Sequence, residues 1–111
     1  MGKNRSGELV QGTLPLLILR TLASGPNHGF AIARRIQQVS NEVLRVEEGS
    51  LYPALHRLEV EGSIEAEWRL TENNRNAKYY RLTRSGRRQL EREAQRWNAI
   101  ATAIAAVMRE A

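Results

Sequence analysis

Residues 48–82, which read EGSLYPALHRLEVEGSIEAEWRLTENNRNAKYYRL, decide the fold of this 111-residue chain. In the first part of the stretch, Leu51, Leu55 and Leu58 recur at the spacing of one helix face. Gly62 follows them, and a glycine there can adopt the left-handed conformation that ends a helix. The spacing therefore predicts a helix that begins near the start of the stretch and ends at the glycine.

Two runs typical of β-strands follow the predicted helix. In residues 64–69 apolar and charged side chains alternate, and residues 79–82 are rich in aromatic and branched side chains. Residues 71–77 between them are turn-forming and carry amides and a cation, which suit phosphate oxygens or a DNA minor groove. A helix followed by such a hairpin is the order of parts in a winged helix-turn-helix. This order points to duplex DNA.

The rest of the chain supplies helices for that fold. The first helix is expected to begin at Thr13 or Leu14, with Pro15 in its first turn where no N–H partner is lost. Asn27 is expected to cap a second helix, and Thr83 a last helix that runs to the C-terminus. We therefore expect a mainly α fold with a small two-stranded β wing and a long C-terminal helix.

Length and composition allow one compact domain. Residues 1–8 are expected to form a flexible basic arm carrying Lys3 and Arg5, which could follow a DNA groove or be disordered. Residues 9–83 are expected to form the DNA-binding unit, and residues 84–111 a dimerisation helix.

The charge distribution favours a polyanionic partner. The formal net charge is +5, and fifteen of the seventeen cations are arginines, whose planar fork suits phosphates and guanine edges. Residues 69–88 hold seven cations and one anion. A basic surface that serves only solubility is the alternative. The chain has no cysteine and no long apolar run, so a cytoplasmic protein without a membrane partner is expected.

The C-terminal segment has a stripe typical of helix pairing. Its apolar residues step alternately by four and three, as in the seam of a coiled coil. A second copy of the chain would bury this stripe, so we expect a homodimer; the alternative is that the helix folds back on its own domain. The stripe consists of Leu90, Ala94, Trp97, Ala101, Ile104 and Met108, of which Leu90, Trp97, Ile104 and Met108 are the expected dimer interface.

Three motifs resemble those of the PadR family of bacterial transcriptional regulators. They are PNHGF at 26–30, EGSLYPAL at 48–55 and KYYRLT at 78–83, followed by Ser85 and Gly86. The resemblance implies a winged helix-turn-helix repressor, dimeric through its C-terminal helix, that binds a two-fold operator. It also implies a response to small apolar or aromatic compounds. The single C-terminal helix is similar to the compact subfamily.

The candidate DNA-binding residues lie on four segments: the third helix, the wing, the second helix and the N-terminal arm. In this fold the N-terminal part of the third helix faces the bases, which selects side chains on the face away from the leucines. Ser50 could instead be only an N-terminal cap or a first-turn residue. Tyr52 could be a buried ring rather than the backbone contact that the resemblance implies, and His56 could be an ordinary surface residue. The candidates are Ser50, Tyr52, His56 and Arg57 on the helix; Asn74, Arg75 and Lys78 on the wing; and Arg34, Arg35, Lys3 and Arg5 outside them.

Trp97 has two interpretations. It could anchor the dimer interface, where aromatic residues are enriched. The resemblance implies instead that the two copies of Trp97 line a flat apolar effector pocket, with Ala94, Ile100 and Ala101 as neighbours and Asn98 as a polar handle.

An enzyme is not expected. The chain has no cysteine or aspartate, and its two histidines have no second metal ligand at a useful spacing, so neither a metal nor a cofactor is predicted. The predicted function is a sequence-specific, ligand-responsive repressor that acts as a homodimer on a palindromic operator. The alternative is a dimeric winged-helix module that binds RNA or protein without operator specificity.

Overall fold

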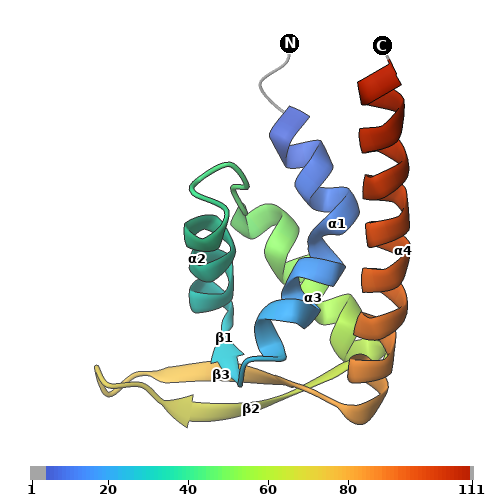
Figure 1. Cartoon of the computed structure of the whole chain (residues 1–111). Coiled ribbons are helices and arrows are strands. Elements are labelled where there is room, and N and C mark those ends of the chain that lie inside the picture. The colour runs from blue at the N-terminus through green and yellow to red at the C-terminus, as the bar shows by residue number, and fades with distance from the viewer. Residues whose placement is uncertain (1–4, 111) are drawn as a thin grey trace.

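In this computed structural model, helices surround the core and a β-hairpin projects from them (Figure 1). The structure describes the backbone of residues 5–110 and the side chains of residues 12–110. The elements in chain order are α1 (Arg5–Leu22), β1 (Asn27–His28), α2 (Gly29–Val39), α3 (Glu48–Val60), β2 (Ile64–Leu70), β3 (Asn76–Leu82) and α4 (Arg84–Glu110). The predicted winged helix-turn-helix with a long last helix is confirmed.

The start predicted for the first helix is wrong. α1 begins at Arg5, so Pro15 lies inside it and residues 5–8 are helical rather than a loose arm. The prediction failed because glycine and polar residues are only weak evidence for a loop. Once a helix is nucleated, extending it by one residue costs little free energy. Residues 1–4, with Lys3, lie outside the described residues.

The sheet has three strands rather than the predicted two. β1 pairs with β3, which places Asn27 opposite Tyr80 and His28 opposite Tyr79. Asn27 is therefore not the cap of α2. His28 takes that position, and its Nδ1 accepts a hydrogen bond of 3.3 Å from the Ala31 N–H. A strand of two residues is too short to show a period of two in the sequence.

α3 follows its predicted course. It begins at Glu48, and Gly62 beyond its end has a φ of 83°, the left-handed conformation expected there. The Ser63 N–H donates to the Leu58 carbonyl at 2.9 Å, which satisfies a carbonyl of the last turn. The helix therefore passes directly into β2.

The core lies where α1, α2, α3 and the base of the sheet meet. α3 buries its leucine face, as its spacing predicts, and Tyr80 of β3 closes the core from the sheet side. The buried apolar residues are Leu14, Ile18, Leu19, Leu22, Ile32, Ile36, Leu51, Leu55, Leu58, Ile64 and Tyr80.

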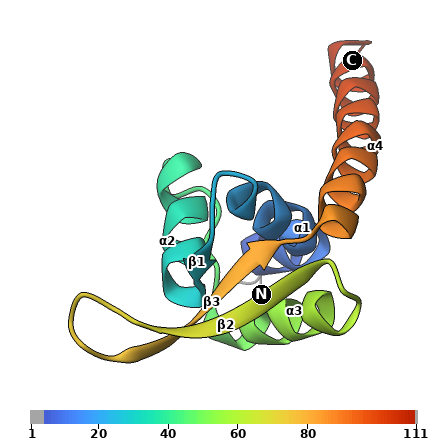
Figure 2. The same cartoon turned by 90° about the horizontal axis from the view of Figure 1, so that it is seen from below.

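The hairpin of β2 and β3 extends well beyond this core (Figure 2). Its register places Ile64 opposite Leu82 at the base and Leu70 opposite Asn76 at the far end. In the turn the Thr71 N–H donates to the Arg75 carbonyl at 2.7 Å. Only the base of the hairpin is covered by helices, so its outer half is open on both faces.

α4 leaves the body of the molecule as a rod. It has 27 residues, a length of about 40 Å, and Figure 2 shows that its C-terminal part stands away from the other elements. Thr83 caps it as predicted, since its Oγ1 accepts from the Gly86 N–H at 3.0 Å. Leu90 still packs against the core, whereas Ile104 and Met108 are 55% and 70% exposed. Among the described residues, no helix is both long and apolar enough to cross a bilayer.

Candidate nucleic-acid interface

The N-terminal half of α3 offers a solvent-facing edge. Because Leu51 and Leu55 point into the core, Tyr52 and His56 lie on the exposed side of the helix. Ser50 is half-buried in the first turn, and Glu47 rather than Ser50 holds the N-cap position. Ser50 therefore lies in the first turn of α3 and is not its N-cap.

Tyr52 stands where α3 meets the N-terminus of α2. Its ring is 44% exposed, so the prediction of a buried ring is wrong. The ring lies so close to Gly29 that a Cβ built on Gly29 would come within 2.8 Å of Tyr52 Cε1. The glycine thus makes room for the ring, which is held against α2 with one side open to solvent.

Arg57 lies on the other flank of α3. It lines a hollow of about 480 Å³ together with Pro15 of α1 and with Gln89, Trp97 and Ile100 of α4. This flank faces the long helices rather than the wing. The structure therefore separates Arg57 from Tyr52 and from the hairpin, although all were predicted to serve one surface.

The two predicted arginines of α2 also diverge. Arg34 lines a hollow of about 400 Å³ between α2 and α3, together with Phe30, Glu48 and Tyr52. Arg35 lines a different hollow, between α1 and α2. Only Arg34 is close to the exposed edge of α3.

The face of the hairpin that looks toward α3 is tied to that helix by an ion pair. This inner face consists of every second residue of the two strands, from Ile64 and Leu82 at the base to Leu70 and Asn76 at the end. Lys78 Nζ lies 3.1 Å from Glu59 Oε1 of α3 and 5.7 Å from the centre of the Tyr80 ring. Lys78 is thus placed between the wing and α3, but with its charge partly compensated.

Burial of Tyr80 beside this pair has an electrostatic effect. Its ring is 6% exposed, and this burial raises the pKa of the phenol, with the nearby Lys78 cation opposing the shift. Tyr80 is therefore neutral under ordinary conditions and serves as packing. Tyr79, on the opposite face, packs against His28 in a T-shaped arrangement, with the ring centres 5.4 Å apart.

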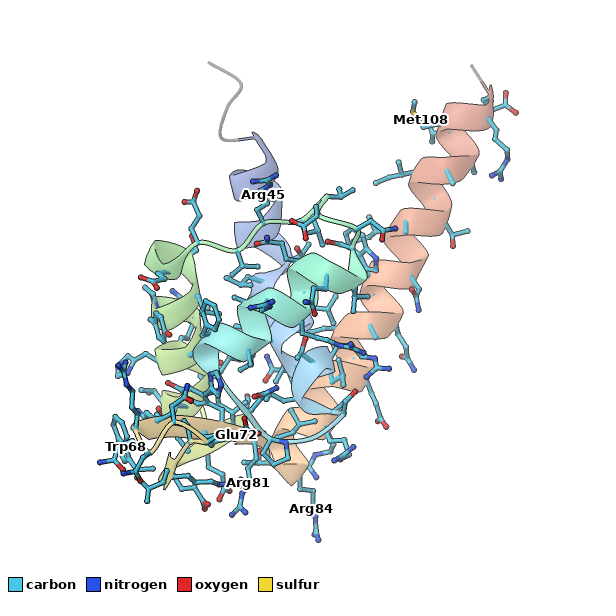
Figure 3. The ribbon with its side chains drawn as sticks, turned by 90° about the vertical axis from the view of Figure 1, so that its left-hand side faces the viewer. Arg45, Trp68, Glu72, Arg81, Arg84 and Met108 are labelled. Atoms are coloured by element: carbon cyan, nitrogen blue, oxygen red, sulfur yellow. The ribbon has the colours of Figure 1, made fainter. Side chains whose placement is uncertain are left out.

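The outer face of the hairpin is largely neutralised by its own ion pairs. Arg81 Nη2 lies 2.7 Å from Glu65, and this hydrogen-bonded carboxylate raises the pKa of the guanidinium further. Arg69 Nε lies 2.9 Å from Glu67, with its guanidinium 4.8 Å from the Tyr79 ring centre. Figure 3 shows Arg81 and Arg84 pointing downward, away from the helices.

The tip of the wing carries the predicted polar residues. Asn74 has a φ of 61°, a conformation that asparagine tolerates, and the Arg75 N–H donates to Thr71 Oγ1 at 3.3 Å. Both side chains are exposed, and Arg75 makes no ion pair within the part of the chain that the structure describes. Arg75 is therefore a full positive charge at the far end of the hairpin.

Sequence reasoning missed three residues of this surface. Glu59 was not among the predicted residues, but it is the ion-pair partner of Lys78. Trp68 and Leu70 are 68% and 65% exposed on the inner face of the hairpin. Their alternation with charged residues placed them on one face of the hairpin. It could not show that the helices do not extend far enough to cover that face at Trp68 and Leu70.

A further hollow holds part of the predicted effector pocket. A groove of about 340 Å³ between α1 and α4 is lined by Ala94, Trp97 and Asn98 together with Leu17 and Leu44. Ile100 lies instead in the hollow with Arg57, and Ala101 lines neither. The structure thus brings three of the five predicted pocket residues together. Within residues 5–110 no cluster of side chains suited to a metal ion occurs.

Comparison with known proteins identifies the family. Residues 18–92, which span α1 to the start of α4, match the family described as the transcriptional regulator PadR-like family. The chain belongs to the PadR-like family. It is thus a DNA-binding transcriptional regulator with a winged-helix fold, and the family is one of regulators rather than enzymes.

The relatives whose names give a function agree with this assignment. A transcriptional regulator of Mycobacterium tuberculosis, Rv3488, is 36% identical over 72% of this chain and 71% of its own length. An uncharacterized 37.1 kDa protein in transposon TN4556 of Streptomyces fradiae is 44% identical over 71% of this chain, which spans only 21% of that protein. The crystal structure of a PadR-like transcriptional regulator from Bacillus cereus superposes with a TM-score of 0.79 at 27% identity, covering 91% of this chain and 96% of the other.

Proposed function

We propose that this PadR-like protein binds a palindromic operator as a homodimer and represses transcription by excluding RNA polymerase. One observation carries the proposal: the exposed edge of α3, bearing Tyr52 and His56, lies beside a hairpin whose tip presents Arg75 as an uncompensated cation. A major groove admits the helix while the hairpin reaches the adjacent backbone or minor groove.

The α4 stripe supports a dimer. Trp97, Ile100 and Ile104 are 41%, 46% and 55% exposed along one side of a helix that extends past its own domain. A second copy would remove this apolar area from water, which stabilises association in proportion to the area buried. Two copies of α3, one DNA turn apart, would then read a two-fold site.

The groove between α1 and α4 suggests how an effector would act. Apolar side chains dominate its lining, and Asn98 offers an amide at its margin. A small apolar or aromatic compound bound there would contact both α1 of the DNA-binding unit and α4 of the dimerisation arm. It would release DNA only by binding the DNA-free arrangement of the two subunits better than the bound one.

The first experiment is selection of binding sites from a random duplex library at near-physiological salt. Repression through an operator requires enrichment of a two-fold symmetric site. Tight, salt-sensitive binding without enrichment would instead leave a module that binds RNA or protein through the same basic surface. Recovery of a single unpaired half-site would argue against a dimeric reader.

The dimer is tested separately by sedimentation. Ile104→Glu places a charge in the exposed stripe and is expected to produce monomers, because the carboxylate would have to be buried unpaired. Ala106→Glu adds the same charge to the opposite side of α4, where it should leave the dimer intact. Equal behaviour of the two variants would refute an interface along the stripe.

A further inference from the structure

Trp68 occupies an unusual place on the hairpin. It continues the inner face that begins with buried Ile64 and half-buried Ala66, and it pairs across the strands with Lys78. Because the helices cover only the base of that face, the indole is 68% exposed. Figure 3 shows it at the margin of the molecule, on the side where α3 lies.

Packing within the chain does not explain this tryptophan. The hairpin is held by the pairing of its two strands and, on the opposite face, by the contacts of Arg69 with Glu67 and with the Tyr79 ring. An indole that is 68% exposed adds little buried area to those contacts, and neighbouring Leu70 is 65% exposed as well. Large apolar side chains that are exposed side by side mark a surface for a partner.

The residues around Trp68 indicate what that partner is. Lys78 is its cross-strand neighbour, and Asn76, opposite Leu70, brings an amide to the same face. Arg75 lies directly before Asn76 in the turn, with its charge unpaired among the described residues. An apolar face rimmed by cations and an amide matches a sugar-phosphate backbone, whose phosphates face the cations while deoxyribose and base edges face the indole.

We propose that Trp68 is a DNA contact of the wing, packing its indole against the deoxyribose edges of the minor groove next to the segment that α3 reads. This inference rests on the proposed DNA-binding function and deepens it. The contact is apolar, so it adds affinity without displacing counterions. It also adds affinity equally for operator and unrelated duplex, because deoxyribose carries no sequence information.

The test compares Trp68→Ala and Trp68→Phe with wild type on a mixed-sequence duplex of about 20 base pairs, two helical turns. Trp68→Ala is expected to weaken binding at least about fivefold, the lower end for losing an aromatic contact to nucleic acid, while the dependence of affinity on salt stays parallel to wild type. Trp68→Phe is expected to retain most of the affinity. Val43→Ala, in the loop before α3 and 69% exposed, controls for loss of an exposed apolar side chain elsewhere.

A direct readout uses wild-type protein labelled with ¹⁵N-tryptophan. The chain has two tryptophans, so it gives two indole N–H signals, and Trp68→Phe identifies one of them by its disappearance. That signal is expected to shift when the duplex is added. This measurement holds even if Trp68→Ala perturbs the hairpin.

The outcomes separate the two levels of the proposal. Salt-sensitive binding by wild type, with an unmoved Trp68 signal and unchanged affinity of Trp68→Ala, overturns the Trp68 contact and leaves the DNA-binding function standing. A loss of affinity of the expected size in Trp68→Ala, accompanied by a flatter salt dependence than in wild type, also overturns the Trp68 contact, because the effect would then be electrostatic. Absence of duplex binding by wild type overturns both.

Discussion

The ion pair between Lys78 and Glu59 leads to a quantitative prediction about the wing. From sequence alone, Arg75 and Lys78 would contribute equally to DNA binding, as two cations of one hairpin. Among residues 5–110 Arg75 makes no ion pair, whereas Lys78 Nζ lies 3.1 Å from the Glu59 carboxylate. We therefore expect the two cations to differ in how many counterions they displace from DNA.

The magnitude follows from counterion release. Each cation that neutralises a phosphate contributes about 0.9 to the slope of log K against log salt, so two copies in a dimer contribute about 1.8. Arg75→Ala should flatten the slope by that amount. Over a fourfold rise in salt, its affinity relative to wild type should then change by about 12-fold.

The Lys78 pair should behave differently. Lys78→Ala removes a cation that is already partly compensated, so it should flatten the slope by less than the value of about 1.8 per dimer expected for Arg75→Ala. Glu59→Gln keeps a hydrogen-bond acceptor for Lys78 but removes the carboxylate charge. It should therefore raise affinity and make the slope steeper than in wild type.

The assay is fluorescence anisotropy of a labelled duplex, titrated at several salt concentrations with each variant. Glu59→Gln in the Lys78→Ala background is the matched control, because without the lysine the carboxylate has no partner to release. A Lys78→Ala slope equal to that of Arg75→Ala, together with an unchanged slope in Glu59→Gln, would falsify the compensation argument.

Three further predictions concern packing and protonation. Gly86→Ala would place a Cβ 1.9 Å from the backbone oxygen of Ser63, so the free energy of unfolding measured in urea should fall by at least about 2 kcal/mol. A smaller decrease would show that α4 is free to shift. In Gly29→Ala the new Cβ would meet only the far end of the Tyr52 ring, at 2.8 Å, so the ring should turn. DNA binding should then weaken, while the free energy of unfolding falls by less than about 1 kcal/mol. Unaltered DNA binding would exclude Tyr52 from the interface. Burial raises the pKa of Tyr80 above its ordinary value of 10.0, so the contribution of the neutral phenol to stability is fully present below pH 10.0 and is lost as pH rises through the folded-state pKa. The unfolding free energies of wild type and Tyr80→Phe should therefore diverge only above pH 10.0. Curves that stay parallel above that pH would contradict the raised pKa.

The local parts of the fold were predictable because their signals lie within one turn or one strand. The leucines of α3 and Gly62 after it follow from helical period and backbone conformation. The alternation in β2 and the turn-forming residues placed the hairpin in the same way. The two-residue strand β1 escaped because its existence depends on pairing with β3, which lies about fifty positions later in the chain.

The composition of the candidate surface was also predictable, but its arrangement was not. Neighbouring Arg34 and Arg35 were predicted as one pair, yet they line hollows on different sides of α2. Arg57 was grouped with Tyr52 but faces α1 and α4. Adjacent residues on a helix point about 100° apart, so proximity in sequence does not place side chains on one surface.

The sequence by itself determined that this chain folds as a winged helix with a long amphipathic last helix and a basic hairpin, since these features depend on local periodicity and composition. Only the tertiary structure decided which cations stay uncompensated and which apolar residues stay exposed. Glu59 partly compensates the charge of Lys78 across 19 positions of sequence, and Trp68 is left in solvent because the helices end before the hairpin does. Both outcomes depend on how separate elements pack, and that packing is what turns a basic chain into a surface with one face suited to DNA.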